Sequence, residues 1–339
     1  MSLLKPKPMN RIVLKSFLTV LPVLISNYSI GQDTTPSGKS SLRVFSDFKQ
    51  GIKSNDHSSA FEVKRVYLGY SGSISEHFSA EVKLDIGSPE DLSQYSLIRR
   101  YAYFKTAALT YKKDRITAYF GLFDMMQFKT QEQFWGYRYI AKSFQDEYKF
   151  GFSADLGAGL KYRINDFLEA DIVVSNGEGY NNLQTDDSYN TGIGLTFKSE
   201  SGIILRSYFD FIKKEILSND IICFAGYQTS KFRLGAEYNS KFNSSFLENH
   251  NLSGYSFYGT YVINEQWELF GKYDILRSNV LNGETQPWNL SKDGSAIITG
   301  IQFKPVKGIF LSLNYQDWVA YAQNGTDKAY LYFNLQFEL

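Results

Sequence analysis

Hydrophobic and polar residues alternate with a period of two over most of this chain. From Phe78 to Ile86, every second residue is apolar and the residues between them are polar or charged. The alternation recurs at Leu168–Val174 and Ile309–Tyr315, whereas a helical period is hard to find. This pattern is typical of β-strands with one apolar and one polar face. Because the polar faces carry full charges, we expect one face of each strand to contact water.

The pattern predicts an all-β fold with about sixteen strands, most of them close to the length that a tilted membrane strand needs. The expected strands are residues 40–50, 61–73, 77–87, 98–111, 115–122, 150–163, 167–175, 188–198, 202–212, 219–228, 231–241, 252–263, 266–277, 294–304, 308–317 and 327–339.

The connections between these strands alternate in length. Short connections, such as residues 75–77 and 264–265, alternate with long polar ones, such as 242–251 and 278–293. A soluble sandwich has no reason to separate its loops in this way. Tight turns at one end and longer loops at the other are typical of a closed antiparallel transmembrane β-barrel. The last expected strand has an unbroken apolar face, and in a closed barrel its edge pairs with the first strand.

The longest interruption among the expected strands is Leu122–Lys149. It is rich in aromatic residues, and its basic and acidic residues are interleaved. Structureless connections of this length are uncommon in compact domains and usually indicate a functional loop. The composition suits a loop that is packed on one side and wet on the other. We therefore expect residues 122–149 to be the third extracellular loop, folded into the barrel as a constriction.

The N-terminus has the features of a secretory signal peptide. Lys5, Lys7 and Arg11 precede the apolar run Phe17–Ile25, and small residues follow at Ser29 and Gly31. Residue 32 is Gln32, so we expect no lipoprotein anchor. After this segment no apolar run is long enough for a transmembrane helix. We expect a signal peptide at residues 1–31, an outer-membrane barrel at 32–339, and localisation in the outer membrane of a Gram-negative bacterium.

Charge and cysteine content exclude several classes of protein. The net charge is +1, which gives no basic excess for a nucleic-acid partner. The single cysteine, Cys223, excludes an intramolecular disulfide and a multi-cysteine zinc site. The three histidines fall in expected turns and loops, where solvated polar residues are common. We expect no metal site and no cofactor.

Several short motifs resemble those of one family. Arg65–Gly69 with Ser71–Gly72, followed by Phe78–Gly87, resembles the opening hairpin of phosphate-selective porins of the O/P type. Tyr119–Phe123 is similar to the strand end where that family begins its third, inward-folded loop, and Ser175–Gly179 is similar to a later loop start. The resemblance covers most of the mature chain in pattern. It implies a sixteen-stranded, usually trimeric outer-membrane porin that contacts lipid and passes small solutes or anions such as phosphate.

Charged residues expected on the lumen side are nearly balanced between basic and acidic, so they form no cationic ladder. Selectivity in a water-filled barrel depends on the pore diameter and on the charge at its narrowest point. We therefore hypothesise a transverse field there, with a basic wall and a mixed loop; the alternative is that these charges neutralise one another and hydrate the wall. The candidate pore residues are Arg65, Arg115, Glu132, Arg138, Lys142, Asp146, Lys161, Arg163, Arg206 and Arg233.

Enzyme motifs are poor. Asp155–Gly159 contains Gly-x-Gly within an expected strand rather than at a strand-to-helix turn, so we interpret its small residues as room for the folded-in loop. No histidine falls on an expected strand to serve as the base for a serine. We expect no enzyme but a passive porin for small hydrophilic or ionic solutes. One alternative is a plugged barrel that acts as a surface scaffold or adhesin; another is an outer-membrane hydrolase.

Overall fold

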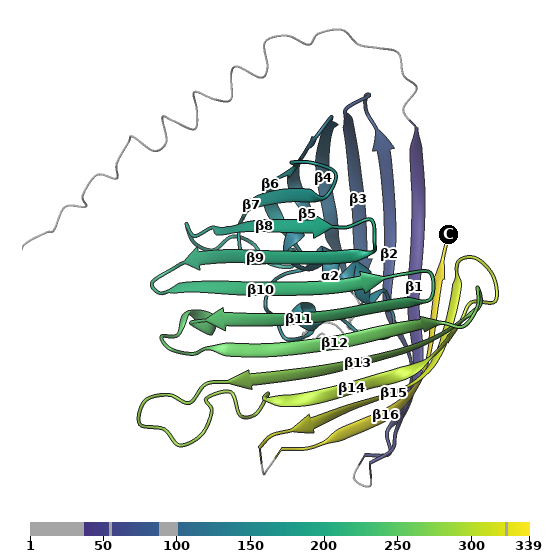
Figure 1. Ribbon diagram of the computed structural model, residues 1–339, viewed down its shortest axis with the longest axis vertical. Coiled ribbons are helices and arrows are strands. Elements are labelled where there is room, and N and C mark those ends of the chain that lie inside the picture. The colour runs from purple at the N-terminus through teal and green to yellow at the C-terminus, as the bar shows by residue number, and fades with distance from the viewer. Residues whose placement is uncertain (1–36, 54–55, 88–100, 323–324) are drawn as a thin grey trace, which may run out of the picture. The chain divides into compact units, whose positions relative to one another are not determined.

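The computed structural model describes residues 37–53, 56–87, 101–322 and 325–339, so the expected signal peptide lies outside the described residues. Within these ranges the chain forms sixteen strands (Figure 1). They are β1 (Gly38–Gly51), β2 (Ser59–Ser73), β3 (Phe78–Ile86), β4 (Ala102–Lys113), β5 (Ile116–Asp124), β6 (Ala154–Arg163), β7 (Leu168–Ser175), β8 (Asn190–Lys198), β9 (Ile203–Lys213), β10 (Leu217–Gln228), β11 (Phe232–Phe242), β12 (Leu252–Val262), β13 (Trp267–Ser278), β14 (Gly294–Phe303), β15 (Ile309–Ala320) and β16 (Lys328–Glu338).

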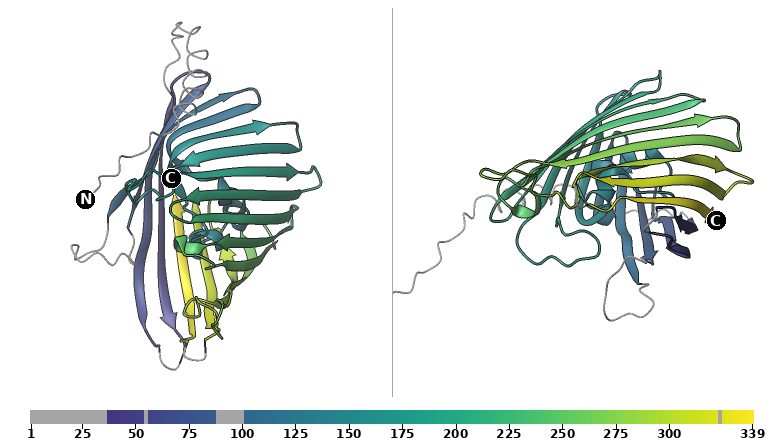
Figure 2. Two further views of the ribbon diagram at one scale, coloured as in Figure 1. Left: turned by 90° about the vertical axis from the view of Figure 1, so that its left-hand side faces the viewer. Right: turned by 90° about the horizontal axis from the view of Figure 1, so that it is seen from below.

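Every strand pairs antiparallel with its neighbours in sequence, and β1 pairs with β16 to close a barrel. At this seam Phe48 lies opposite Phe333 (Figure 2, purple beside yellow). The predicted closed antiparallel barrel is therefore confirmed, with strand ends that differ from expectation by a few residues. The start of the expected strand 98–111 lies outside the described residues up to residue 100, and β4 begins at Ala102.

The faces of the strands are inverted relative to those of a soluble protein. Along β9, Leu205 and Phe209 point outward and are 47% and 42% exposed. Arg206 and Asp210, each the residue after one of these, point inward and are 3% and 5% exposed. An apolar outer band around a polar interior is the arrangement that a lipid environment favours. Among the described residues, none of the helices has the length and apolar character that crossing a membrane would require.

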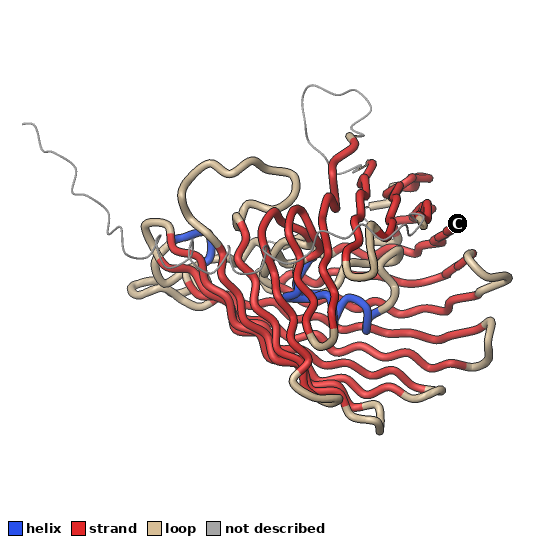
Figure 3. Tube along the Cα trace, turned by 90° about the horizontal axis from the view of Figure 1, so that it is seen from above, coloured by secondary structure: helices blue, strands red, loops and turns tan. Residues whose placement is uncertain are grey.

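The connection between β5 and β6 contains the two α-helices of the described chain, α2 (Met126–Trp135) and α3 (Phe144–Glu147). Figure 3 shows the helical part of this connection among the strands rather than outside them. The expected boundaries need correction, because residues 122–124 belong to β5 and the connection continues to residue 153. We call residues 125–153 the inner segment. A 3-10 helix, η2 (Ser244–Phe246), lies in the long connection between β11 and β12.

Candidate pore constriction

The inner segment is a compact structure with a closed base. The backbone N–H of Met125 donates to the carbonyl oxygen of Ser153 at 3.1 Å, which joins the two ends of the segment. Helix α2 ends at Gly136, which has φ 77° and whose N–H donates to the carbonyl of Glu132 at 3.0 Å. A left-handed residue at this position is the usual way to end a helix, and glycine adopts it without strain.

Aromatic side chains anchor the inner segment to the opposite wall. Trp135 and Tyr137 are each 1% exposed and pack with Phe270 in the largest buried cluster. The Tyr137 hydroxyl donates to Glu268 at 2.9 Å, and a second tyrosine, Tyr139, reaches β14 in the same way. Buried aromatic residues with a satisfied hydroxyl combine apolar contact with directional hydrogen bonding. These contacts fix the segment against β12–β14.

Three glycines in the wall provide the space that these side chains occupy. A Cβ atom on Gly226 would lie 2.8 Å from Cζ of Phe134, closer than real Cβ contacts allow. A Cβ on Gly254 would lie 2.1 Å from Cζ of Phe144. In β6, Gly159 faces Met126 in the same way, as the small residues of Asp155–Gly159 led us to expect. The wall is thus shaped to receive the inner segment on both sides of the barrel.

Two arginines hold the ends of α2. Arg206 on β9 donates to the carbonyl oxygen of Met126 at 2.8 Å. Arg233 on β11 donates to the carbonyl of Trp135 at 3.2 Å. The carbonyl groups in the last turn of a helix have no partner within that helix, so the second contact satisfies an acceptor that would otherwise be buried and unpaired. Both arginines were predicted as pore residues, and the structure places them on the barrel wall in contact with the backbone of the inner segment.

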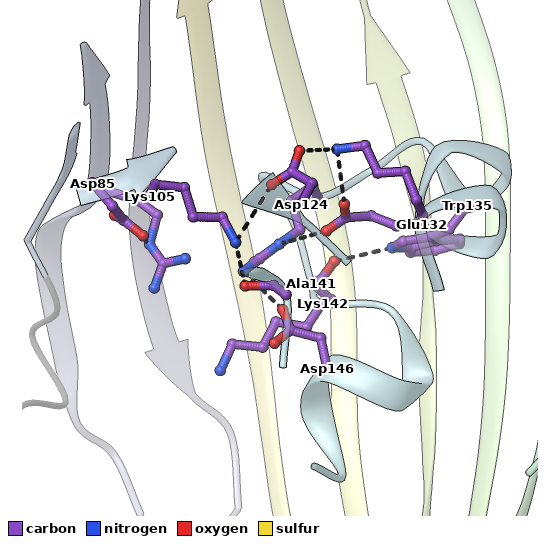
Figure 4. A network of polar contacts seen from close by, with 12 residues as sticks. Asp85, Lys105, Asp124, Glu132, Trp135, Ala141, Lys142 and Asp146 are labelled. Carbon is purple, nitrogen blue, oxygen red and sulfur yellow. Dashed lines mark hydrogen bonds and ion pairs between the residues drawn. The ribbon is translucent and has the colours of Figure 1, made fainter. Parts of the chain in front are cut away.

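On β2–β5 and the inner segment, charged side chains form one chain of ion pairs from Lys105 to Asp146 and two separate pairs, which we together call the charged strip. Its members are Arg65, Glu81, Lys83, Asp85, Lys105, Asp124, Lys129, Glu132, Arg138 and Asp146. Lys129 lies 2.6 Å from Asp124. Figure 4 shows Asp124 between Lys105 and Glu132. Arg138 lies 3.3 Å from Glu132 and 3.0 Å from Asp146. The inner segment therefore contributes both signs of charge to the strip.

The facing wall also contributes charges of both signs. Arg65 on β2 lies 3.3 Å from Asp85 on β3. On the same strand, Lys83 and Glu81 are 2.6 Å apart. Each basic member of the strip has an acidic partner within it, and the strip as a whole contains five of each. This pairing favours the alternative in which the charges neutralise one another, and it gives no support to a wall that is basic throughout.

Lys129 remains positively charged at neutral pH. Burial alone would lower the pKa of its ammonium group, but the carboxylates of Asp124 and Glu132 outweigh burial and raise that pKa above its ordinary value. Glu81 on β3 acts on the same ammonium group. The inner segment and β3 therefore lie within electrostatic range of each other.

The structure divides the predicted pore residues into three groups. Glu132, Arg138 and Asp146 meet in one network, whereas Arg65 on β2 forms a separate pair with Asp85 on β3. Arg206 and Arg233 hold α2, as described above.

Three predicted residues lie at the other end of the strands. Arg115 precedes β5 and donates to the carbonyl of Ile164 at 3.0 Å, and Arg163 donates across the same pair of turns. Lys161 pairs with Glu169 at 3.7 Å. None of these contacts joins the inner segment, so within the described chain the structure does not bring this group together with the strip. Lys142 contributes its carbonyl, which accepts from Lys272 at 3.0 Å.

The candidate pore residues omitted six members of the strip: Glu81, Lys83, Asp85, Lys105, Asp124 and Lys129. Lys105 lies 3.7 Å from Asp124, and it also contacts the hydroxyl of Ser153. Asp124 and Lys129 are five residues apart in the sequence, and in a loop without secondary structure this spacing predicts no contact. They meet because β5 ends at Asp124 and α2 begins at Met126. Of these features only helix α2 had a signal in the sequence, because Met126–Trp135 contains good helix formers.

Comparisons with known proteins agree on the fold alone. No protein-family model matches this chain, and no curated protein matches it. The structure is similar to that of OmpF from Salmonella typhi in complex with daunomycin, with a TM-score of 0.69 and 12% identity over 89% of this chain and 97% of that one. It is also similar to an anion-selective porin from Comamonas acidovorans, with a TM-score of 0.66 and 11% identity over 90% of this chain and 100% of that one. OprB from Pseudomonas putida has the same TM-score of 0.66, with 8% identity over 89% of this chain and 94% of that one.

The chain has the fold of a porin. In a closed barrel every strand has a hydrogen-bonded neighbour on each side, so the backbone groups are paired within the protein and need no water. An apolar outer face can then contact the acyl chains of the lipids. The present barrel has both properties. The predicted localisation in the bacterial outer membrane is confirmed on this basis.

Proposed function

We propose that this protein is a passive channel for small hydrophilic solutes, with the inner segment as its constriction. The observation that carries the proposal is the difference in water accessibility between the two sides of the lumen. The side chains of Lys129 and Glu81 in the charged strip are 37% and 42% exposed, whereas Lys272 on the packed wall is 2% exposed. Water and solutes therefore pass between the inner segment and β2–β4. The long connections face outward from the cell and the short turns face the periplasm, as in barrels of this type.

The strip does not favour strong ion selectivity. Its basic and acidic members are equal in number and paired, so their fields largely cancel beyond the Debye length. Membership of the phosphate-selective family, which the sequence motifs imply, predicts an anion preference instead. One of the similar structures is titled as an anion-selective porin, and this chain shares only 11% identity with it. A trimer is the expected assembly, since another similar structure, OmpT of Vibrio cholerae, is described as a trimer form.

The deciding experiment is single-channel conductance of the refolded protein in a planar bilayer, with a salt gradient to give the reversal potential. We expect steady conductance and a reversal potential close to zero. A reversal potential that favours anions, and conductance that persists with phosphate as the only anion, would support the family-like selectivity. Absent conductance in a correctly folded barrel would reject the channel.

The plugged barrel is a second candidate because one specific observation favours it. Many inward-facing residues from β9 to β16 are buried, among them Asn239, Ser256 and Asn334 at 0% exposure. A barrel that is filled to this extent on one side has little lumen left. The same conductance measurement separates the candidates, and binding of the intact outer surface to host or cell-wall polymers would be the next test of a scaffold.

We propose no enzymatic activity. Lys105 contacts Ser153, which superficially resembles an activated serine, but Asp124 lies 3.7 Å from the same ammonium group. A contact between a serine and a lysine does not by itself make a catalytic site, which also needs oxyanion donors and a place for the reacting atom beside the serine. Failure of a serine-reactive fluorophosphonate probe to label the protein, compared with a Ser153→Ala variant, would support this exclusion of a hydrolase.

A further inference from the structure

The connection between β7 and β8 is attached to the base of the inner segment. It begins with two glycines of positive φ, Gly177 at 82° and Gly179 at 80°, a conformation that glycine adopts without strain. The N–H of Gly177 donates to the carboxylate of Asp155 at 2.5 Å. The N–H of Tyr180 donates to the carbonyl oxygen of Ala154 at 3.0 Å. Both bonds hold the connection at the start of β6, where the inner segment ends.

Further contacts fix the same connection on two sides. A Cβ atom on Gly179 would lie 2.5 Å from Cδ1 of Phe152, so the backbone here packs directly on the inner segment. Lys214, which follows β9, lies 2.8 Å from Glu178 and 2.9 Å from Asp186. These contacts determine where the residue after Gly179 places its side chain.

That residue is Tyr180, and its side chain reaches β3 and β4. Its hydroxyl donates to Asp85 at 2.9 Å. Its ring centre lies 4.5 Å from the ammonium nitrogen of Lys105, which is within the range of a cation–π contact. Asp85 also pairs with Arg65, and Lys105 pairs with Asp124. Tyr180 therefore joins the separate pair on β2 and β3 to the chain of ion pairs that continues into the inner segment.

The charged side chains of β3 differ in their access to water. Glu81, Lys83 and Asp85 lie on one face of the strand, because successive side chains of a strand point to opposite faces. Their side chains are 42%, 26% and 3% exposed, respectively. Lys105, which the Tyr180 ring contacts, has a side chain that is 9% exposed. The wall of β3 and β4 thus meets water at Glu81 and is covered at Asp85, where Tyr180 lies.

We propose that Tyr180 limits the size of the solutes that pass, so that the inner segment and the connection between β7 and β8 narrow the channel together. The proposal rests on the channel function proposed above and adds a residue that determines its size limit. The path of solutes runs along β2–β4, and the ring of Tyr180 occupies space on that wall. Pore diameter is one of the two properties that decide which solutes pass, and the neutral ring acts on diameter rather than on charge.

Liposome swelling with neutral sugars tests the size limit, because the charges of the pore do not act on them. The full chain is reconstituted, and swelling rates are measured in arabinose, a monosaccharide, and raffinose, a trisaccharide. The ratio of the two rates is independent of the number of channels. We expect Tyr180→Ala to raise the raffinose-to-arabinose ratio severalfold and to raise the single-channel conductance. The reversal potential should stay unchanged, since the two groups that this variant uncovers, Asp85 and Lys105, have opposite charges.

Two matched variants separate the ring from other effects. Tyr180→Phe keeps the ring, and Asp85 keeps its pair with Arg65 at 3.3 Å, so the ratio should remain that of the wild type. Tyr189→Ala makes the same substitution as Tyr180→Ala in the same connection, at a residue that is 55% exposed. It should also leave the ratio unchanged.

A chemical restoration of the ring provides a measurement on a single folded channel. Tyr180→Cys is made together with Cys223→Ala, which removes the native thiol, and its conductance is recorded before and after addition of benzyl methanethiosulfonate. The cysteine thiolate displaces methanesulfinate, and the benzylthio group that remains carries an aromatic ring. We expect the conductance to fall toward the wild-type value during the recording.

The outcomes distinguish this proposal from the proposed function. Absent swelling in both sugars with a correctly folded wild-type barrel would overturn the channel itself. Normal swelling with the same ratio in Tyr180→Ala and the wild type would overturn the size limit and keep the channel. A ratio raised equally in Tyr189→Ala, or a conductance that does not change when the benzyl group is attached to Tyr180→Cys, would overturn the assignment to Tyr180.

Discussion

The two sides of the lumen contain the same kinds of residue and use them in opposite ways. On the packed wall, Arg206 and Asp171 form an ion pair with two contacts, 2.6 and 3.0 Å long, and their side chains are 2% and 1% exposed. In the charged strip, Lys129 and Asp124 form a pair of the same length, but their side chains remain 37% and 27% exposed. The first pair is part of the structure that holds the inner segment, and the second is part of the surface that solutes meet. A charged residue that points into a barrel can therefore either stabilise the fold or contact solutes. Whether the inner segment buries its side chain determines which of the two it does.

The largest expected effect is on the stability of the packed wall. Asp171→Asn leaves the Arg206 guanidinium buried without its counter-charge, and removal of one partner of a buried pair costs about 3–5 kcal/mol. We expect a loss of this size in the free energy of unfolding, measured by urea titration of the folded barrel with tryptophan fluorescence.

The matched control for this prediction is Glu338→Gln. Glu338 pairs with Arg43 at 2.9 Å, but the two side chains are 35% and 52% exposed. Its removal should cost less than about 1 kcal/mol. Equal losses in the two variants would contradict the distinction between buried and exposed pairs.

A second prediction concerns the space that the wall provides for the inner segment. In Gly226→Val, the new side chain overlaps the ring of Phe134, and overpacking of this kind costs about 1–3 kcal/mol. We expect the inner segment to be displaced toward the charged strip, with a lower single-channel conductance or frequent closures, together with reduced stability.

The control for Gly226→Val lies on the neighbouring outer surface. A Cβ on Gly271 in β13 would have only one atom within 4 Å, the carbonyl oxygen of Ile298 at 3.8 Å. Gly271→Val should therefore leave conductance and stability at the wild-type values. A conductance that is unchanged in Gly226→Val would mean that Phe134 adapts without moving the segment.

A smaller effect is expected within the strip. Glu132→Gln removes one of the two carboxylates beside Arg138, whose side chain is 22% exposed. Because Asp146 remains at 3.0 Å and water screens the site, the stability loss should be below about 1 kcal/mol. The reversal potential should shift toward anions, since the strip then has one more base than acids. A loss as large as that of Asp171→Asn would show that the strip is structural rather than solute-facing.

The fold was predictable from the sequence because the period of two is a local signal. Each strand of the barrel has an apolar and a polar face, and this alternation alone located strands such as β3 and β9 within a few residues. Aromatic content likewise indicated that the connection after β5 is packed. The one-turn and ten-residue helices inside it were missed, because helix α2 has no side-chain hydrogen bond at its N-terminal cap to mark its start.

The site was less predictable, because it depends on contacts between residues far apart in the chain. Arg115 and Arg206 have the same residue type and both alternate into the lumen, yet one lies at a turn and the other under α2. No local pattern distinguishes these two positions. Only the path of the inner segment does, and that path follows from side chains such as Phe134 fitting the space at Gly226.

The smallest expected effect lies outside the barrel wall, in the connection between β7 and β8. Hydrogen bonds from Ser188, and then the ammonium group of Lys214 at 2.9 Å, lower the pKa of the Asp186 carboxyl to about 2. A carboxyl whose pKa is lower in the folded state stabilises that state above its unfolded pKa, and the stabilisation disappears as the pH falls through the folded value. The ion pair between Asp186 and Lys214 should therefore be intact at pH 4 and lost near pH 2.

Pepsin, which is active over this range, can report the loss through cleavage near Leu183, a residue that is 86% exposed. Asp186→Asn should be cleaved faster than the wild type at pH 4 and at the same rate near pH 2, whereas Asp187→Asn should match the wild type throughout. Glu178 also contacts Lys214 and is present in all three proteins, so the ratio of rates isolates Asp186. A ratio that does not change with pH would mean that Asp186 does not hold this connection.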